Sequence, residues 1–192
     1  MRLFVAVNLP AAERERIWRA TAAFRRVAPV RWTAADSFHV TLKFLGNVDP
    51  ARVPAVSEAL RIAARQSPPF ELALQGFGAF PDWRRPRIFW VGAEAPGINV
   101  LQRVVEDEIG PLGFPGEARP FHPHVTVGRA SRDLSRGDAA ELARMSDRFD
   151  YSARLRIETV ELMQSHTTPN GSRYSVVATA GLGNGEGWET GA

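Results

Sequence analysis

Two segments of the sequence, residues 38–46 and 121–129, each carry a histidine and a threonine separated by one valine. Imidazole gains and loses protons near neutral pH, because its unperturbed pKa is about 6.5. Two imidazoles on opposite sides of a phosphorus atom can activate a water molecule and protonate the leaving oxygen, while threonine hydroxyls donate hydrogen bonds to phosphate oxygens. The pairs His39 with Thr41 and His124 with Thr126 are therefore candidates for metal-independent cleavage of a phosphodiester.

Both segments are predicted to be strands with one apolar face. Successive side chains of a strand point to opposite faces, so each histidine shares a face with its threonine. The residues expected on the opposite, apolar faces are Val40, Leu42 and Phe44 in the first segment and Val125 and Val127 in the second. The polar faces should then line a cleft, where two such strands could act on one small ligand.

Arg129, at the end of the second segment, is a candidate for binding the phosphate. Its guanidinium fork matches two oxygens of a phosphate group. Strict alternation, however, places Arg129 on the face opposite Thr126. Its role therefore requires a bend or a β-bulge near Gly128.

The other two histidines have less support as functional residues. His122 would share the face of His124 in a straight strand, but Pro123 is expected to bend the chain, so we interpret His122 as mainly structural. His166 lies near a predicted turn without a companion motif and is expected on the surface. His122 and His124 could ligate a metal ion together, yet no carboxylate lies at ligand spacing beside either motif. No metal site is expected.

Other familiar sequence motifs are absent. The chain has no cysteine, which excludes disulfides and thiolate metal sites. It has no Gly-x-Ser-x-Gly elbow and no P-loop, and its closing glycines precede no predicted helix, so they are not a dinucleotide fingerprint. No cofactor is expected.

Composition sets broad limits on location and partners. The 192 residues suffice for one sizeable core or two small lobes, and the net charge of +3 permits an anionic partner such as RNA. No stretch approaches the roughly 20 apolar residues of a membrane span, and the apolar run at residues 2–9 is too short for a secretory signal. We expect a cytoplasmic protein without membrane contact and find no indication of an obligate protein partner.

The predicted elements alternate between strands and helices in both halves of the chain. Strands are expected at 2–9, 30–33, 38–46, 70–74, 87–91, 121–129, 151–164 and 174–180, and helices at 11–27, 53–64, 98–109 and 139–145. The link between residues 32 and 38 is too short for a helical crossover, which favours antiparallel pairing. The pattern predicts two antiparallel-rich sheets backed by helices in one domain, 1–180, with a hairpin turn at 169–171 and a disordered glycine-rich tail, 181–192.

These motifs resemble those of the two-histidine (2H) phosphoesterase superfamily. Within it, the similarity is greatest to the bacterial and archaeal RNA 2′,3′-cyclic phosphodiesterases, historically called 2′–5′ RNA ligases. The segments that carry the resemblance are residues 2–7, 39–46, 119–129, 161–165 and 171–174. The resemblance implies an α+β, bilobal, pseudo-twofold fold in which two antiparallel-rich sheets line a central cleft and the helices lie outside.

The resemblance also implies a role for each candidate residue. His39 would donate a proton to the leaving 3′-oxygen, His124 would activate the water molecule, and Thr41, Thr126 and Arg129 would hold the phosphate. The implied activity is hydrolysis of RNA 2′,3′-cyclic phosphate ends to 2′-phosphomonoesters, with 2′–5′ ligation as its reversal and without a cofactor. The partner would be RNA or a nucleotide that ends in a cyclic phosphate.

Two alternatives stay open. One is a 2H phosphodiesterase that acts on a small cyclic phosphate, such as an ADP-ribose cyclic phosphate, or on a 2′–5′ oligonucleotide. The other is a non-catalytic nucleotide- or RNA-binding module, against which the two intact histidines argue. Six aromatic residues are candidates for stacking on a base, although most are expected in the core: Phe38, Phe44, Phe77, Trp83, Phe89 and Phe121.

Overall fold

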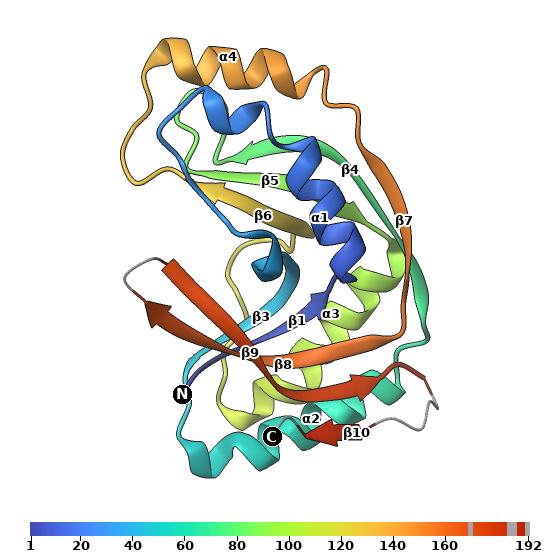
Figure 1. Cartoon of the computed structure of the whole chain (residues 1–192). Coiled ribbons are helices and arrows are strands. Elements are labelled where there is room, and N and C mark those ends of the chain that lie inside the picture. Colours follow the sequence, from blue (N-terminus) through green and yellow to red (C-terminus); the bar gives the residue numbers. More distant parts are fainter. Residues whose placement is uncertain (169–170, 184–187, 191–192) are drawn as a thin grey trace.

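The computed structural model describes residues 1–168, 171–183 and 188–190 (Figure 1). The strands in this part of the chain are β1 (Arg2–Asn8), β2 (Arg31–Trp32), β3 (His39–Asn47), β4 (Phe70–Phe80), β5 (Ile88–Glu94), β6 (His124–Arg129), β7 (Ser152–Ile157), β8 (Thr159–Thr168), β9 (Gly171–Gly181) and β10 (Trp188–Thr190). The α-helices are α1 (Ala11–Ala20), α2 (Val53–Arg65), α3 (Pro96–Ile109) and α4 (Arg136–Ser146). No helix in the described residues is long and apolar enough to cross a membrane.

All strand pairs are antiparallel, in the order β10-β9-β8-β1-β3-β6-β5-β4-β7, with β2 paired to β6. The two halves of this order meet at β3 and β6 through a single residue pair, Val40 with Val125. We call β10, β9, β8, β1 and β3 the β3 lobe, and β6, β5, β4, β7 and β2 the β6 lobe. The described strands thus form one sheet, in which the two predicted antiparallel sheets are joined edge to edge at their motif strands.

The helices pack on the sheet and close the core. In α2 the buried residues Val56, Leu60 and Ala63 recur at helical spacing, which gives the helix one apolar face. This helix contacts α3 and strands β8 and β9, while α3 contacts β3 and β4, and α4 contacts β4 (Figure 1). The apolar faces of both motif strands belong to this core, since Val40 and Val125 are fully buried. Burial of these faces supplies the main driving force for holding the motif strands in place.

Two predicted elements differ from the structure. The helix expected over 11–27 ends at Ala20, because the chain turns so that Phe24 stacks on Phe77 of β4 at a ring separation of 3.9 Å. The single strand expected over 151–164 is wrong: β7 pairs with β4 in the β6 lobe, whereas β8 pairs with β1 in the β3 lobe. One residue, Glu158, separates these two strands of different lobes.

The end of the chain also differs in part from the expectation. Residues 188–190, inside the predicted disordered tail, form β10 and pair with β9. The predicted hairpin turn includes residues 169 and 170, which lie outside the described part of the chain. Strands β8 and β9, which flank it, are paired from Thr159 with Gly181 to Thr168 with Gly171, with one register shift between Leu162 and Met163.

Each motif strand contains a β-bulge immediately after its threonine. On β3, Thr41 pairs with Ala6 and Lys43 with Val5, so Leu42 is the extra residue. On β6, Thr126 pairs with Trp90 and Gly128 with Phe89, so Val127 is the extra residue. A bulge shifts the alternation of side chains by one position. The two lobes therefore repeat the same local geometry at positions 85 residues apart.

Candidate active site

The two histidine–threonine pairs meet at the junction of the two lobes. Val40 and Val125 face each other across the junction, and each lies between the histidine and the threonine of its own strand. The two valines point into the core, so the flanking polar residues project to the other face. His39, Thr41, His124 and Thr126 are all half-buried there. The structure thus brings together the four residues that the sequence selects.

Both histidines are oriented by the same local hydrogen bond. Nδ1 of His39 lies 2.8 Å from the carbonyl oxygen of Ser37, and Nδ1 of His124 lies 2.6 Å from that of His122. A carbonyl oxygen only accepts, so we assign a donated proton to each Nδ1. The opposite nitrogen, Nε2, is left as the site of proton exchange on both rings.

Both histidines are neutral in the unliganded protein at neutral pH. Burial, with the nearby charges of Arg129 and His124, lowers the pKa of His39 to about 4, and the hydrogen bond to Ser37 offsets this only in part. Burial also lowers the pKa of His124, again with contributions from Arg129 and from His122. Each neutral Nε2 is therefore a base, and an acid form requires a bound anion that favours the imidazolium.

Arg129 lies on the same face as the histidines. The extra residue Val127 supplies the bulge that this position requires, so the exposed side chain of Arg129 returns to the side of Thr126. The effect of its charge on the pKa of both His39 and His124 is consistent with this placement. A guanidinium near two imidazoles favours their neutral forms and provides a binding group for an anion.

The matching bulge on β3 corrects the expectation for Phe44. Strict alternation placed Phe44 on the apolar face, but the extra residue Leu42 moves it to the histidine face, where 56% of its surface is exposed. Its cross-strand partner Phe4 contacts the His39 ring at a centroid distance of 5.0 Å. Lys43 takes the buried position and binds the carboxylate of Glu106.

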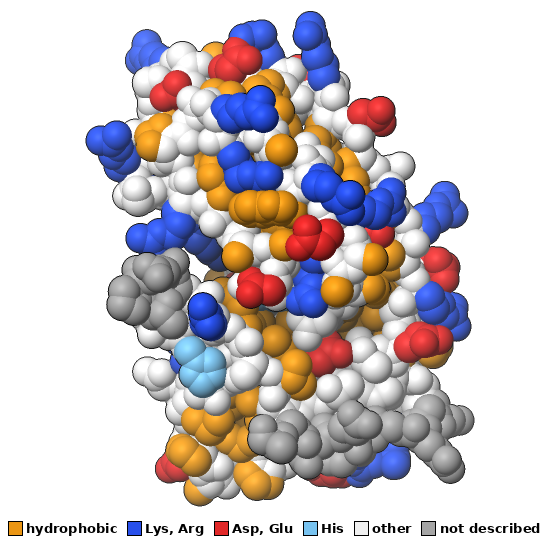
Figure 2. Space-filling model, in the orientation of Figure 1, with side chains coloured by type: hydrophobic (Ala, Val, Ile, Leu, Met, Phe, Trp, Pro, Cys, Tyr) orange, Lys and Arg blue, Asp and Glu red, His pale blue; other side chains and the backbone are white. Residues whose placement is uncertain are grey.

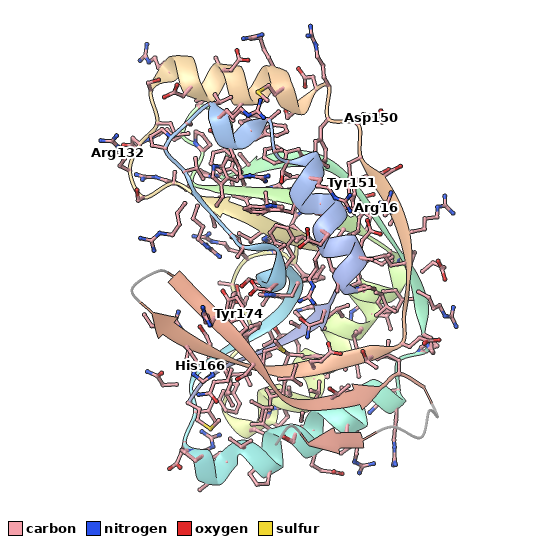
Figure 3. The ribbon with its side chains drawn as sticks, viewed as in Figure 1. Arg16, Arg132, Asp150, Tyr151, His166 and Tyr174 are labelled. Atoms are coloured by element: carbon pink, nitrogen blue, oxygen red, sulfur yellow. The ribbon has the colours of Figure 1, made fainter. Side chains whose placement is uncertain are left out.

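Aromatic rings flank each histidine, and sequence reasoning missed most of them. Phe4 and Tyr174 lie 5.0 Å from the His39 ring (Tyr174 is labelled in Figure 3), and Phe80 lies 5.1 Å from the His124 ring. These residues come from β1, β9 and β4, so only the strand pairing brings them to the motifs. The one signal for Phe4 and Phe80 in the sequence is that, within its strand, each alternates with residues that point into the core.

Trp90 extends the aromatic wall beside His124. It is the cross-strand partner of Thr126, and its ring covers Gly78, where a Cβ atom would lie 2.2 Å from the indole. Its Nε1 is buried and has no hydrogen-bond partner among the described residues. His122, exposed and 6.3 Å from the Trp90 ring, helps orient His124 through its carbonyl group.

Other candidates lie away from this cluster. His166 on β8 is exposed, as expected, and its Nε2 is 2.9 Å from Oγ of Ser175 (Figure 3). Of the six aromatic candidates, Phe38, Phe77 and Phe89 are buried in the core. No group of three histidine or acidic residues that could hold a metal ion occurs in the described part of the chain.

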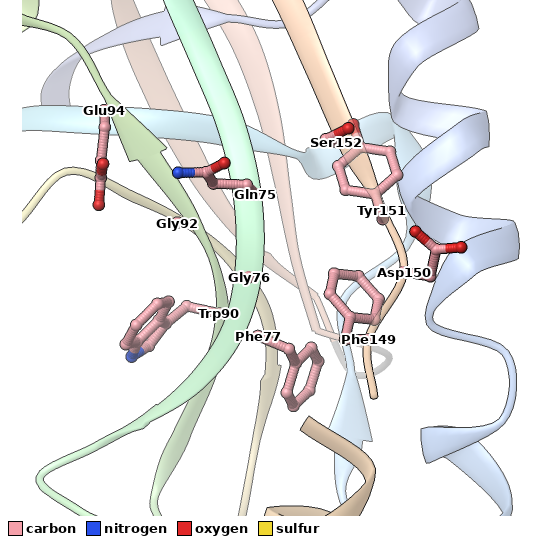
Figure 4. A pocket seen from close by; sticks show the side chains of 10 residues that line it. All are labelled: Gln75, Gly76, Phe77, Trp90, Gly92, Glu94, Phe149, Asp150, Tyr151 and Ser152. Carbon is pink, nitrogen blue, oxygen red and sulfur yellow. The ribbon is translucent and has the colours of Figure 1, made fainter. Parts of the chain in front are cut away.

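An open pocket of about 490 Å³ lies between β4 and residues 149–152 (Figure 4). Its polar side chains include Gln75, Glu94, Asp150 and Ser152, and neither histidine nor threonine of the motifs lines it. It adjoins the histidine cluster through Trp90 and through Gly92, the cross-strand partner of His124. The chemistry of the chain therefore concentrates at the lobe junction rather than in this pocket.

Comparison with known proteins finds a matching family model and several similar chains. Residues 12–169 match the family described as the 2'-5' RNA ligase superfamily. A protein of Methanothermobacter thermautotrophicus named RNA 2',3'-cyclic phosphodiesterase is 32% identical over 91% of this chain and 95% of its own length. A Geobacillus stearothermophilus protein of the same name is 39% identical over 66% of this chain, but the match spans only 41% of that protein.

Solved structures show the same fold. TT0787 of Thermus thermophilus superposes with a TM-score of 0.82 and 27% identity, over 96% of this chain and 100% of that one. Escherichia coli LigT in complex with 3'-AMP superposes with a TM-score of 0.69 and 27% identity, over 94% of this chain and 97% of that one. The predicted bilobal α+β fold is confirmed by these similarities.

Proposed function

Since the chain belongs to the 2'-5' RNA ligase superfamily, we propose that it hydrolyses RNA 2′,3′-cyclic phosphate ends to 2′-phosphomonoesters. The observation that carries this proposal is the placement of two equivalent histidines on the two sides of the lobe junction, each with Nδ1 hydrogen-bonded to a carbonyl oxygen and Nε2 left for proton exchange. The names of the relatives, and the complex of Escherichia coli LigT with a nucleotide, are in keeping with it.

In the proposed mechanism the two histidines have opposite roles. Nε2 of His124 removes a proton from a water molecule, which attacks the phosphorus atom. The bond from phosphorus to the 3′-oxygen breaks, and Nε2 of His39 gives its proton to that oxygen. The products are a 3′-hydroxyl group and a 2′-phosphomonoester, and a second proton exchange with solvent restores both rings.

The remaining site residues stabilise the negative charge. Thr41 and Thr126 donate hydrogen bonds to the non-bridging oxygens, and Arg129 supplies a cation on the same face. The same residues would support ligation, in which a 5′-hydroxyl group replaces water as the nucleophile, the bond from phosphorus to the 3′-oxygen breaks, and a 2′–5′ linkage forms. Such a substrate is in keeping with action in the cytoplasm, which is part of this proposal.

Substrate binding itself supplies the acid. His39 has a pKa of about 4 in the unliganded protein. A phosphate anion about 4 Å away favours the imidazolium by about 4 kcal/mol at an effective dielectric constant of about 20. The bound substrate thus raises the pKa of His39 from its lowered value, so that the ring can carry the proton that it gives to the leaving oxygen.

The test uses a short RNA that ends in a 2′,3′-cyclic phosphate. The wild-type protein should convert it to the 2′-phosphate isomer, identified against synthetic 2′- and 3′-phosphate standards by chromatography and mass spectrometry. The His39→Ala and His124→Ala variants serve as matched controls for a contaminating nuclease. A 3′-phosphate product, or turnover of an ADP-ribose cyclic phosphate but not of RNA, would contradict the proposal.

A further inference from the structure

A second arginine lies directly across from Arg129. Strand β2 pairs with the end of β6, with Arg31 opposite Arg129 and Trp32 opposite Gly128. Directly opposite residues in an antiparallel pair share a face, with Cβ atoms about 5 Å apart. Because the bulge at Val127 returns Arg129 to the histidine face, Arg31 is on that face too.

The short strand β2 is held firmly against β6. The backbone N–H of Thr33 donates to the carbonyl oxygen of Val127 at 2.9 Å. The ring of Trp32 packs on Gly128, where a Cβ atom would lie 2.8 Å from it, and contacts Phe89 at a centroid distance of 5.7 Å. The backbone that carries Arg31 is thus fixed, while its side chain is exposed.

The two guanidinium groups of Arg31 and Arg129 have no acidic partner among the residues that the structure describes. Nearby Arg85 and Arg87, in contrast, both bind Asp133. Like charges directly opposite each other destabilise a sheet, so this pair is best explained by an anion that binds to both.

The position of Arg31 and Arg129 relative to the histidines indicates which anion binds to them. Strands β3 and β2 lie along the same edge of β6, with β3 at Val125 and β2 at Gly128 and Arg129. Arg31 therefore lies beyond the lobe junction, farther from His124 along β6 than the phosphate-binding Thr126. An RNA chain that leaves the histidines along this edge of β6 would bring its preceding phosphate to Arg31.

We propose that Arg31 and Arg129 form a second phosphate site, which binds the phosphodiester that precedes the cyclic end of an RNA chain. This inference rests on the proposed function and makes it more specific: the preferred substrate has at least two nucleotides. Arg129 is shared by the terminal and the preceding phosphate, whereas Arg31 serves the preceding one.

The test compares two substrates in two variants. One substrate is a 2′,3′-cyclic mononucleotide, and the other is the dinucleotide with the same cyclic end. Arg31→Gln should lower the preference for the dinucleotide, expressed as the ratio of the two kcat/KM values, by about tenfold, as expected for one charge-assisted contact. The slope of log kcat/KM against log salt for the dinucleotide should become shallower by about 0.7.

The matched control is Arg103→Gln, which removes the same charge from the exposed face of α3. It should leave the substrate preference unchanged. An equal loss on both substrates in Arg31→Gln, or no loss on either, would overturn the second site. A dinucleotide with a neutral methylphosphonate linkage should lose the preference in the wild-type protein as well.

A binding measurement separates this inference from the proposed reaction. Titration calorimetry with the 2′-phosphate forms of the mononucleotide and the dinucleotide requires no turnover. Arg31→Gln should selectively weaken binding of the dinucleotide, and unchanged binding would overturn the site even if the enzyme is active. Wild-type protein that shows the binding difference but cleaves neither cyclic substrate would refute the reaction and leave the site standing.

Discussion

The two lobes share one local design but differ in the residues that follow the bulge. In both, a histidine, a valine and a threonine precede an extra residue, Leu42 in one lobe and Val127 in the other. Position 44 of the β3 lobe then presents an exposed phenylalanine, whereas the equivalent position 129 of the β6 lobe presents an arginine. The repeated part supplies the two histidines that we propose for proton transfer, and the differing part gives the histidine face one cationic wall at Arg129 and one apolar wall at Phe44.

The cross-strand neighbours of the threonines differ as well. Thr41 faces Ala6, while Thr126 faces Trp90. On the outer surface that Figure 2 shows, basic side chains are spread out rather than gathered in one run, in keeping with the modest net charge of +3. Positive charge near the histidines thus comes mainly from the β6 lobe. Five predictions test this difference between the two lobes.

The largest expected effect is the loss of either histidine, the feature that the lobes share. His39→Ala and His124→Ala should each lower kcat by about 10²- to 10⁴-fold, the range for general acid–base catalysis. The double variant should lose less than the product of the two effects, because the residues act as a unit. Near-normal turnover by either single variant, measured on a short cyclic-ended RNA, would remove that histidine from the mechanism.

The next largest effect is on the stability of the fold. It concerns the residue that follows each bulge, Lys43 in the β3 lobe and Gly128 in the β6 lobe. Lys43→Met leaves the partner carboxylate of Glu106 without its cation and should lower the free energy of unfolding by about 3 kcal/mol. Gly128→Ala should cost about 1–3 kcal/mol, because the new Cβ atom meets the Trp32 ring. Urea denaturation measures both.

The control for this comparison is the double variant Lys43→Met with Glu106→Leu. It removes both charges and should recover part of the loss. A double variant less stable than Lys43→Met would show that Glu106 stabilises the fold through another contact, such as its hydrogen bond with Gln102.

Arg129 should contribute to kcat/KM in a way that an arginine at position 44 of the β3 lobe cannot replace. Arg129→Gln is expected to lower kcat/KM by about 30-fold, since hydrogen bonds to charged groups contribute about 1.5–3 kcal/mol. Arg129→Lys keeps the charge but loses the guanidinium fork and should fall in between. If Phe44→Arg restored the activity of Arg129→Gln, the two walls would be interchangeable, contrary to the comparison above.

The pH dependence should follow the lowered pKa values of both histidines. Activity needs one neutral and one protonated ring, so kcat/KM, which reports the free enzyme, should be bell-shaped with its optimum below pH 6.5. Arg129 disfavours both imidazolium forms, so Arg129→Gln should raise both pKa values and move the optimum to higher pH. A shift to lower pH would contradict the placement of this charge.

The smallest expected effect is at Phe44. Phe44→Ala should raise KM about fivefold with little change in kcat, if a nucleobase stacks on this exposed ring, since such stacking is worth about 1–3 kcal/mol. Phe44→Tyr keeps the aromatic face and is the matched control. An unchanged KM in Phe44→Ala would leave the apolar wall without a role in binding.

The sequence was sufficient to predict the motif strands and the residues that meet at their junction. Alternation placed His39 with Thr41 and His124 with Thr126 correctly, and the need for a bulge near Gly128 followed from the chemistry of Arg129. The same bulge in the first motif was not predicted, because a phenylalanine in an apolar strand is typical of a core residue. The sequence therefore predicted Phe44 on the apolar face, whereas it lies on the histidine face.

What the sequence could not predict depends on pairing between distant strands. Trp90 and Phe80 approach His124 only because β5 and β4 pair beside β6. The division of residues 151–164 into β7 and β8 likewise reflects which partner each half finds, not a local turn signal. The local sequence pattern thus predicts which side chains of a strand share a face. The pairing between distant strands determines which of these faces lie next to each other.

Lys43 carries the only ε-amino group in the sequence, and its side chain is completely buried in the folded protein. An acylating reagent should therefore reach this amine only when β3 separates from α3 and from the carbonyl group of Pro115. The rate at which the peptide around residue 43 becomes acylated would then report how often the catalytic strand opens. This single amine is a built-in chemical probe of local unfolding at the active site.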